Sequence, residues 1–275
     1  MSSNGRPPSS CMGQHRVSFC LERSEGSQAY SARLGSGALT FDRPNMKPFD
    51  TATLCEFYRR ISAKDGVSVA DLRSELDALF QRPRLESDIN AYRLGRAPWK
   101  KLSDEISPID RFLRLSSIEA GRIRFPLNDK APDAWLWRRT QTDPVGIEAT
   151  IAQGRERYHL AEELVTNGVG RGFIGVPDDA PQKWFDIAMS QERTMHATGQ
   201  LLSAISSGIR RCLLRKNDPR FAGYILVIQA PLDSLPPQRW DQKKDELREA
   251  AASLSFSEIH VISEAGTSPW GFQIK

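Results

Sequence analysis

The sequence has no long apolar run. The longest, Tyr224 to Ile228, has five residues, against the ~20 that a membrane-spanning helix needs. The first residues, MSSNGRPPSSCMGQHRVSF, contain no apolar stretch of the length found in secretory signals. These patterns exclude a helical membrane protein and predict a cytoplasmic location.

Cysteine and histidine are scarce, and charge of one sign does not dominate. The four cysteines (Cys11, Cys20, Cys55 and Cys212) form no CxxC pair, and the four histidines are not clustered. This spacing argues against a zinc site and a disulfide framework, and it suits a reducing compartment. With 38 basic and 34 acidic side chains, the net charge is +4. That small surplus permits nucleic-acid binding without requiring it.

Two common catalytic patterns are also missing. The glycine-rich segment GVGRGFIG (168–175) lacks the GK[ST] ending of a phosphate-binding loop. His159 and His196 have no sequence partners that would indicate a Ser-His-Asp arrangement. The chemistry must therefore come from other residues.

Residues 1–48 form a segment of different composition. Ser, Gly, Pro and Arg dominate, and no apolar period persists. Such a segment cannot bury enough surface to offset its ordering entropy, so we expect a disordered or loosely attached basic arm. It either touches a phosphate backbone or is a solvated tail without function.

Residues 49–100 are expected to form a helical subdomain. Thr51 or Thr53 can cap a first helix that ends near Gly66, and Ser68 starts a second one that Pro83 stops. The pair either packs on the main body or reads DNA as a helix-turn-helix. Packing is favoured, because the second helix carries little basic charge.

Residues 101–275 carry the pattern of an α/β domain. The apolar period is helical from Ser103 to about Glu119 and then alternates. The expected strands are 121–125, 133–139, 145–151, 222–228 and 258–263, and the expected later helices are 154–168, 190–216 and 240–254. The predicted fold is a mixed β-sheet flanked by helices, with an N-terminal helical subdomain.

Two carboxylates are expected to meet on neighbouring strands. Glu148 and Thr150 project to one face of their strand. Asp133 lies fifteen residues upstream on the antiparallel neighbour. It faces Glu148 directly if the turn centres between Thr140 and Gln141, and a later turn shifts the pairing by up to three residues. Converging carboxylates favour Mg²⁺ or Mn²⁺.

In the expected order, a helix precedes the strands that carry Pro132-Asp133 and Glu148-x-Thr150, and a further helix and strand follow. This order, with these residues, resembles the PD-(D/E)XK, restriction-endonuclease-like nuclease superfamily. The resemblance spans about residues 103–230. It implies a restriction-endonuclease-like core in which Asp133 and Glu148 hold the metal for hydrolysis of DNA phosphodiester bonds.

The pattern departs from that superfamily at Thr150, where a lysine is usual. A replacement cation could come from Lys216, Arg155 or Arg157, with Gln153 nearby as a polar group. Arg155 and Arg157 could equally be exposed residues, and Lys216 could simply favour the negative end of its helix. Lys216 is preferred, because it closes an otherwise apolar stripe.

Glu105 is a further supporting acid or a helix N-terminal residue without such a role. The leading interpretation is an Mg²⁺-dependent DNA endonuclease with Asp133, Glu148, Thr150 and Lys216 in its site. The alternatives are a catalytically degenerate nuclease fold that binds nucleic acid or scaffolds a complex, and an unrelated α/β protein. A homo-oligomer or a partner protein is compatible with each.

Overall fold

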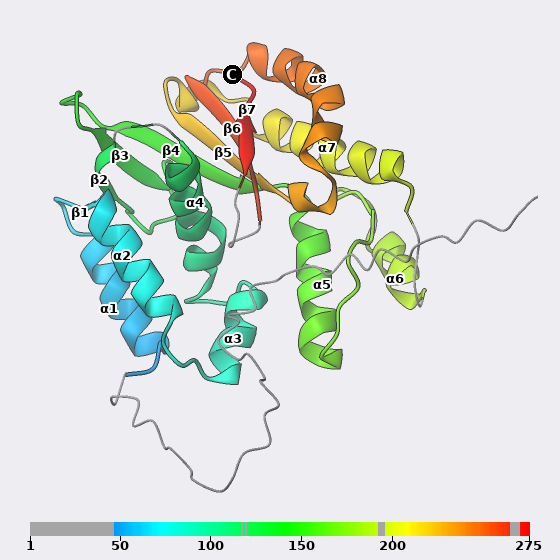
Figure 1. Cartoon of the computed structure of the whole chain (residues 1–275), viewed down its shortest axis with the longest axis horizontal. Helices are drawn as coiled ribbons and strands as arrows, with labels where there is room; N and C mark the ends of the chain where they lie inside the picture. Colours follow the sequence, from blue (N-terminus) through cyan, green and yellow to red (C-terminus); the bar gives the residue numbers. More distant parts are fainter. Residues whose placement is uncertain (1–46, 117, 119, 192–195, 265–269) are drawn as a thin grey trace, which may run out of the picture.

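A seven-stranded mixed sheet forms the centre of the molecule (Figure 1). The computed structural model describes residues 47–116, 118, 120–191, 196–264 and 270–275, so the arm expected at 1–48 lies almost wholly outside the described residues. The strands follow the chain order across the sheet. They are β1 (Val67–Ser68), β2 (Ala120–Arg124), β3 (Ala134–Arg138), β4 (Val145–Ile151), β5 (Ile225–Ala230), β6 (Glu258–Ser263) and β7 (Gly271–Gln273).

Strand direction divides the sheet into two parts. β1 to β4 pair antiparallel, as the alternating pattern predicts, whereas β4, β5 and β6 run parallel and β7 returns antiparallel. All six residues of β5 are buried, which is the signature of a central strand covered on both faces. The prediction of an α/β fold with a mixed sheet is confirmed.

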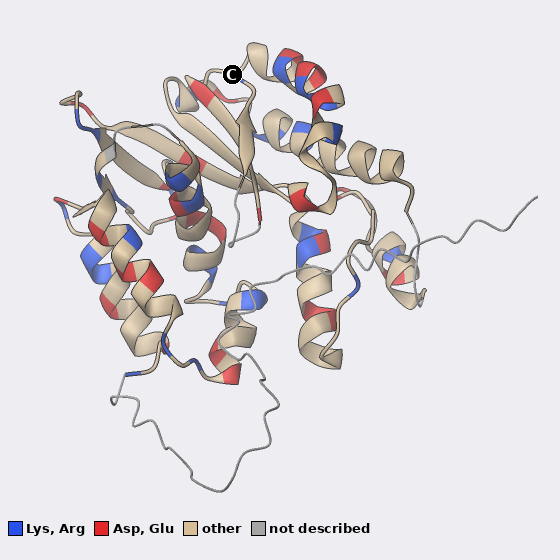
Figure 2. Ribbon diagram, in the orientation of Figure 1, with Lys and Arg blue, Asp and Glu red and all other residues tan. Residues whose placement is uncertain are grey.

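Helices cover both faces of this sheet (Figure 1). One face packs against the N-terminal helices, and the other packs against α7 and α8. The helices are α1 (Thr51–Ile61), α2 (Val69–Phe80), α3 (Glu86–Arg93), the π-helix η1 (Leu102–Ile106), α4 (Ser107–Leu115), α5 (Gly154–Asn167), α6 (Gln182–Ser190), α7 (Thr198–Arg215) and α8 (Asp241–Ala252), with 3₁₀ turns η2 (Pro219–Phe221), η3 (Leu232–Ser234) and η4 (Pro237–Trp240). Charged side chains lie mainly on helices and connections (Figure 2). No helix in the described ranges is both long and apolar enough to cross a membrane.

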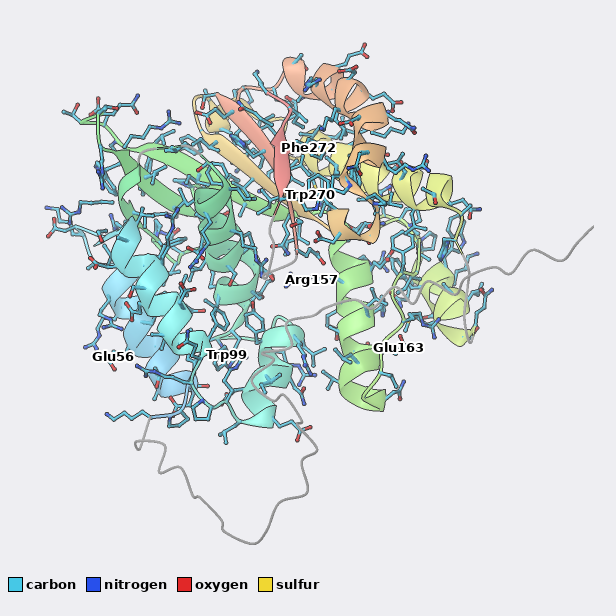
Figure 3. The ribbon with its side chains drawn as sticks, viewed as in Figure 1. Glu56, Trp99, Arg157, Glu163, Trp270 and Phe272 are labelled. Carbon is cyan, nitrogen blue, oxygen red and sulfur yellow. The ribbon has the colours of Figure 1, made fainter. Side chains whose placement is uncertain are left out.

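The N-terminal helices share one apolar core with the sheet. Phe57 and Leu72 join Ile109, Ile147 and Val227 in a continuous buried cluster. The buried Trp99, labelled in Figure 3, packs edge-on to Phe49 within the same cluster. The segment 49–100 therefore packs on the main body through its apolar stripes.

Several expected boundaries are wrong. The first helix is capped by Asp50, which accepts the Thr53 N–H, and not by Thr51 or Thr53. The helix expected from Ser103 to Glu119 begins as η1 and ends at Leu115, where the backbone of Ser116 turns extended. The helix expected from Ser190 begins only at Thr198, because α6 ends at Ser190 and the chain then turns extended at Gln191.

Gly66 allows the turn between α1 and β1 to approach β2. Its φ is +62°, and an added Cβ would overlap the carbonyl oxygen of Ile123. Gly223 has a similar φ of +78° but open space around it. Gly223→Ala should therefore cost only about 1 kcal/mol of unfolding free energy, the strain of a left-handed alanine. Gly66→Ala should cost about 3 kcal/mol or more, because backbone must move. Urea unfolding of both variants measures the difference, and equal losses would contradict the close approach.

Glu156 forms hydrogen bonds with the backbone of the loop that follows α5. The side chain is 3% exposed. Its two carboxylate oxygens accept the N–H groups of Ile174 and Gly175 at 2.9 and 3.0 Å. Burial raises the pKa of Glu156 to about 7, and these hydrogen bonds only partly offset the effect.

The raised pKa of Glu156 predicts a pH-dependent stability. Because the folded pKa lies above the unfolded value of 4.5, the proton stabilises the fold below pH 4.5, and this contribution is lost as the pH rises to about 7. The full change is about 3 kcal/mol. Glu156→Gln lacks this titrating group. The unfolding free energy of the wild type minus that of the variant should therefore decrease between pH 4.5 and 7. A pH-independent difference in urea unfolding would contradict the assignment.

Candidate active site

The open edge of β4 creates the candidate site. β3 pairs with β4 only as far as Ala134 opposite Ile147. The second half of β4, from Glu148 onward, pairs with β5 on one side, and among the described residues no strand pairs with it on the other. Continuing the register places Asp133 opposite Glu148, which corresponds to the turn centred between Thr140 and Gln141.

The Asp133 side chain forms a hydrogen bond with β4 beyond the point where β3 stops pairing with it. Its Oδ2 accepts the N–H of Ala149 at 2.8 Å, so a side chain satisfies a backbone donor that β3 leaves unpaired. Burial, together with the nearby carboxylates of Glu148 and Glu105, raises the pKa of Asp133 to about 7. Burying ionised carboxylates next to one another is unfavourable, so the rest of the fold must hold them in place. Such clusters are common at functional sites.

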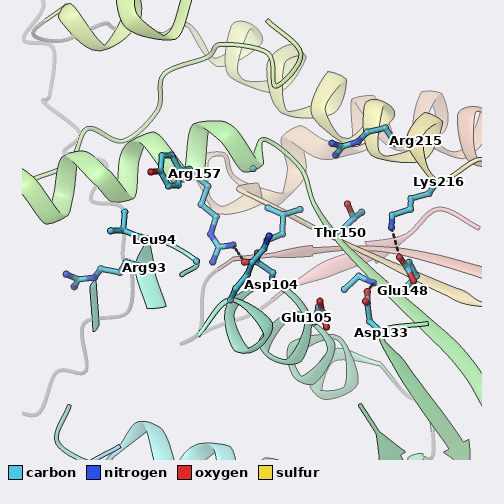
Figure 4. Close-up of a pocket in the computed structure, with 16 residues that line it drawn as sticks. Arg93, Leu94, Asp104, Glu105, Asp133, Glu148, Thr150, Arg157, Arg215 and Lys216 are labelled. Carbon is cyan, nitrogen blue, oxygen red and sulfur yellow. Dashed lines mark hydrogen bonds and ion pairs between the residues drawn. The ribbon is translucent and has the colours of Figure 1, made fainter. Parts of the chain in front are cut away.

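Lys216 and Glu148 form an ion pair above β4. Lys216 follows the last turn of α7, and its Nζ lies 2.5 Å from Oε1 of Glu148. Glu148 is only 6% exposed, and its second oxygen, Oε2, is buried without a hydrogen-bond partner. Figure 4 shows the Lys216 side chain reaching down to Glu148, beside Asp133.

Glu105 brings a third carboxylate from the opposite side. It lies on η1, the kind of π-turn that is frequent at functional sites. Oε1 accepts a hydrogen bond from Lys101 at 2.7 Å, and Oε2 is buried without a partner. Burial raises the pKa of Glu105 despite the Lys101 ammonium. Figure 4 shows Glu105 facing Asp133.

A cleft of about 710 Å³ opens over these carboxylates. Its walls come from α3, η1, α5 and the end of α7, and Arg157 on α5 pairs with Asp104 on η1 at 3.2 Å (Figure 4). The basic residues in its lining are Arg93, Lys100, Arg157, Arg215 and Lys216. The acidic floor therefore lies between positively charged walls.

A second hollow of about 630 Å³ is lined by the same carboxylates. Glu105, Asp133, Glu148 and Lys216 line both hollows. The basic residues that line only the second one are Lys101, Lys130 and Arg220. The carboxylates thus lie between two hollows that both contain basic side chains, with Asp104 as a further acid in the first and Asp129 in the second.

The donor chemistry of the pair fits a hard divalent cation. Within the described ranges, no three Asp, Glu, His or Cys side chains form a group that could hold a metal ion. Mg²⁺, however, is usually bound through one or two carboxylates and completes its shell with water and substrate phosphates. Asp133 faces Glu148, whose Oε2 is buried and unpaired, so the pair supplies the oxygens that such an ion needs.

Of the other expected site residues, Thr150 and Arg157 lie in the cleft, whereas Arg155 and Gln153 do not. Thr150 lines the cleft, and its hydroxyl lies 3.9 Å from the Cys212 sulfur. Arg155 points away: it donates to the carbonyls of Asp178 and Ala180 and stacks over Phe185. Gln153 is buried and lines a different cavity.

Sequence reasoning missed Lys101, Lys100 and Arg93, which line the hollows. The spacing of Lys101 and Glu105, four residues apart on a helix, was a usable signal for the pair. Arg93 lies on α3, a helix that the sequence pattern did not reveal.

Comparison with known proteins adds no relative. No model of a protein family, no curated protein and no solved structure matches this chain.

Proposed function

We propose that this protein is a metal-dependent nuclease that hydrolyses DNA phosphodiester bonds. The observation that carries the proposal is the Lys216–Glu148 pair at 2.5 Å opposite Asp133, on the open edge of β4 between basic walls. These are the residue types that phosphodiester cleavage uses: two carboxylates for a divalent ion and one cation for the phosphate charge.

The order of elements supports a restriction-endonuclease-like core. Helix α4 precedes the antiparallel strands β2, β3 and β4, and a helical connection then leads to β5, parallel to β4. In the resemblance drawn from the sequence, the acidic residues lie on the second and third of these strands. Glu148 lies on β4, the third of these strands, and Asp133 directly precedes the first residue of β3, the second.

Each residue of the site has a role in this proposal. Asp133 and Glu148 would hold Mg²⁺ or Mn²⁺, which supplies a more acidic bound water and positive charge beside phosphorus. Lys216 replaces the cation absent at Thr150, since its ammonium already lies at the carboxylates. The arginines and lysines in the walls bind backbone phosphates on either side of the scissile bond.

A catalytically degenerate nuclease that binds nucleic acid or scaffolds a complex is the second candidate. The observation that favours it is that Lys216 occupies one oxygen of Glu148, so an ion must compete with an existing ion pair. Binding of DNA through the basic walls requires no metal.

Metal-induced stabilisation, followed by cleavage assays, tests the proposal. Mn²⁺ should raise the melting temperature of the wild type and support cleavage of DNA, and Glu148→Ala should lose both effects. Glu162→Ala, an exposed acid on α5, is the matched control and should keep both. Metal binding without cleavage of any DNA or RNA would favour the degenerate nuclease, and neither effect in the wild type would contradict the metal site.

A further inference from the structure

A separate cavity of about 460 Å³ lies between the start of α5 and the outer face of α7. It shares no lining residue with the two hollows over the carboxylates. Its volume falls in the range of about 300–1,000 Å³ that small-molecule sites occupy. The lining residues are Gln153, Pro177, Gly199, Gln200, Ser203, Ala204, Ser207 and Arg211.

Gln153 gives this cavity an unsatisfied amide. The residue is 2% exposed, and both its Oε1 and its Nε2 are buried without a hydrogen-bond partner. Leaving such a group unpaired costs about 1–3 kcal/mol. The backbone is also held in the left-handed region at a φ of +57°, and Gly208 on α7 leaves room for the side chain. The fold therefore maintains this amide at a cost.

Arg211 adds an unused pair of donors. Its Nη1 lies 3.4 Å from the carboxylate of the exposed Asp179, whereas Nε and Nη2 are buried and unpaired. These two N–H groups lie on one edge of the guanidinium and match the two oxygens of a carboxylate or phosphate. The contact with Asp179 involves Nη1 alone and leaves the edge formed by Nε and Nη2 unpaired.

The remaining lining suits an anion. Ser203 and Ser207 lie on the same face of α7 as Arg211, two turns and one turn before it, and both line the cavity. Gly199 and Gln200 belong to the first turn of this 18-residue helix and line the other end of the cavity, about 18 Å along the helix axis from Arg211. Asp179 is the opposing charge, and it is 72% exposed and screened by solvent.

We infer that this cavity binds a small molecule that carries a phosphate or carboxylate group, held by the free edge of Arg211. A second polar group of the ligand both donates to and accepts from the Gln153 amide. A nucleotide combines these features, because a purine presents a donor beside an acceptor. The inference does not depend on the proposed nuclease activity, since it rests on other residues.

Calorimetric titration of the full chain tests this site. AMP is the phosphate probe and citrate the carboxylate probe, so the probe that binds identifies the class of anion. Arg211→Met should weaken binding of that probe ~10-fold or more, one decade being the least that a lost charged contact predicts. Arg210 is an exposed arginine next to Arg211 on α7, and Arg210→Met should leave binding unchanged.

Gln153→Met separates recognition from folding. The variant removes a buried amide without a partner, so it should melt at or above the wild-type temperature and still lose affinity for the probe. The inference is overturned if neither probe gives a saturable heat at about 10 mM, ten times a weak Kd of about 1 mM. Equal weakening by Arg210→Met and Arg211→Met would also overturn it, since general surface charge would then explain the binding.

Discussion

Asp133→Asn should abolish metal-dependent cleavage and, without metal, make the protein more stable at pH 8. The carboxylate is buried beside Glu148 and Glu105, and this environment raises its pKa to about 7. At pH 8 the folded state therefore carries an ionised group that it disfavours, at a cost of about 1.4 kcal/mol for each pKa unit. Asparagine keeps an oxygen to accept the Ala149 N–H but removes the charge.

The gain should be about 2 kcal/mol or more, which corresponds to ~5 °C in melting temperature for a chain of this size. The sign depends on pH. The protonated wild-type carboxyl stabilises the fold below pH 3.8, and this contribution is lost as the pH rises to about 7. The variant and the wild type should therefore melt alike near pH 4 and diverge by pH 8.

Asp143→Asn is the matched control, because Asp143 is exposed in the loop of the same β3–β4 hairpin. It should change neither cleavage nor the melting temperature. Saturating Mg²⁺ should reverse the order of stability, since it binds the wild type and not Asp133→Asn. A metal-free Asp133→Asn protein that melts below the wild type at pH 8 would show that the carboxylate is not strained.

The sheet was the most predictable part of the fold. β4 and β6 have the bounds that the sequence predicts, and β2, β3 and β5 differ by one to three residues at each end. Their residues either alternate or are apolar throughout, so hydrophobic burial alone identifies them. β1 and β7 are only two and three residues long, and no period can be recognised over such lengths.

The helices that escaped prediction have weak apolar stripes. No residue of α3 is buried, and only Phe185 of α6 is. Both helices depend on packing between segments distant in sequence and carry little local signal. The same holds for the expected helix 103–119: its apolar stripe is present, but the π-turn at its start and its end at Leu115 follow from tertiary packing.

The site was predictable where strand geometry decides it. The facing of Asp133 and Glu148 follows from one of the two turn positions considered, and the structure contains that register. The position of Lys216 followed from its place on the α7 stripe, whereas its distance from Glu148 depends on how α7 crosses the sheet. Gln153, Gly154 and Arg155 are consecutive at the start of α5, and Gly154 lines the cleft. The backbone turns left-handed at Gln153, and the side chains of Gln153 and Arg155 lie outside the cleft, in a separate cavity and against the 178–180 loop.

Lys216→Met should reduce cleavage ~10²-fold or more, the usual scale for losing one preorganised electrostatic partner. Methionine keeps the length and the apolar stem but leaves Glu148 buried without its counter-charge. The metal-free variant should therefore also lose stability, because an unpaired buried carboxylate is unfavourable. DNA affinity should fall much less, since one phosphate contact among several contributes little to counterion release.

A double-mutant cycle separates the electrostatic role of Lys216 from its role in folding. Adding Glu148→Gln to Lys216→Met should restore stability, because both charges are then gone, but it should not restore cleavage. Lys243→Met removes a lysine–carboxylate pair on α8 whose acid, Glu246, is exposed and which lines neither hollow, so this control should leave cleavage unchanged. If Lys216→Met cleaves DNA at the wild-type rate, the phosphate charge is met by another wall residue, and Arg215 and Arg157, which also line the cleft, become the next positions to test.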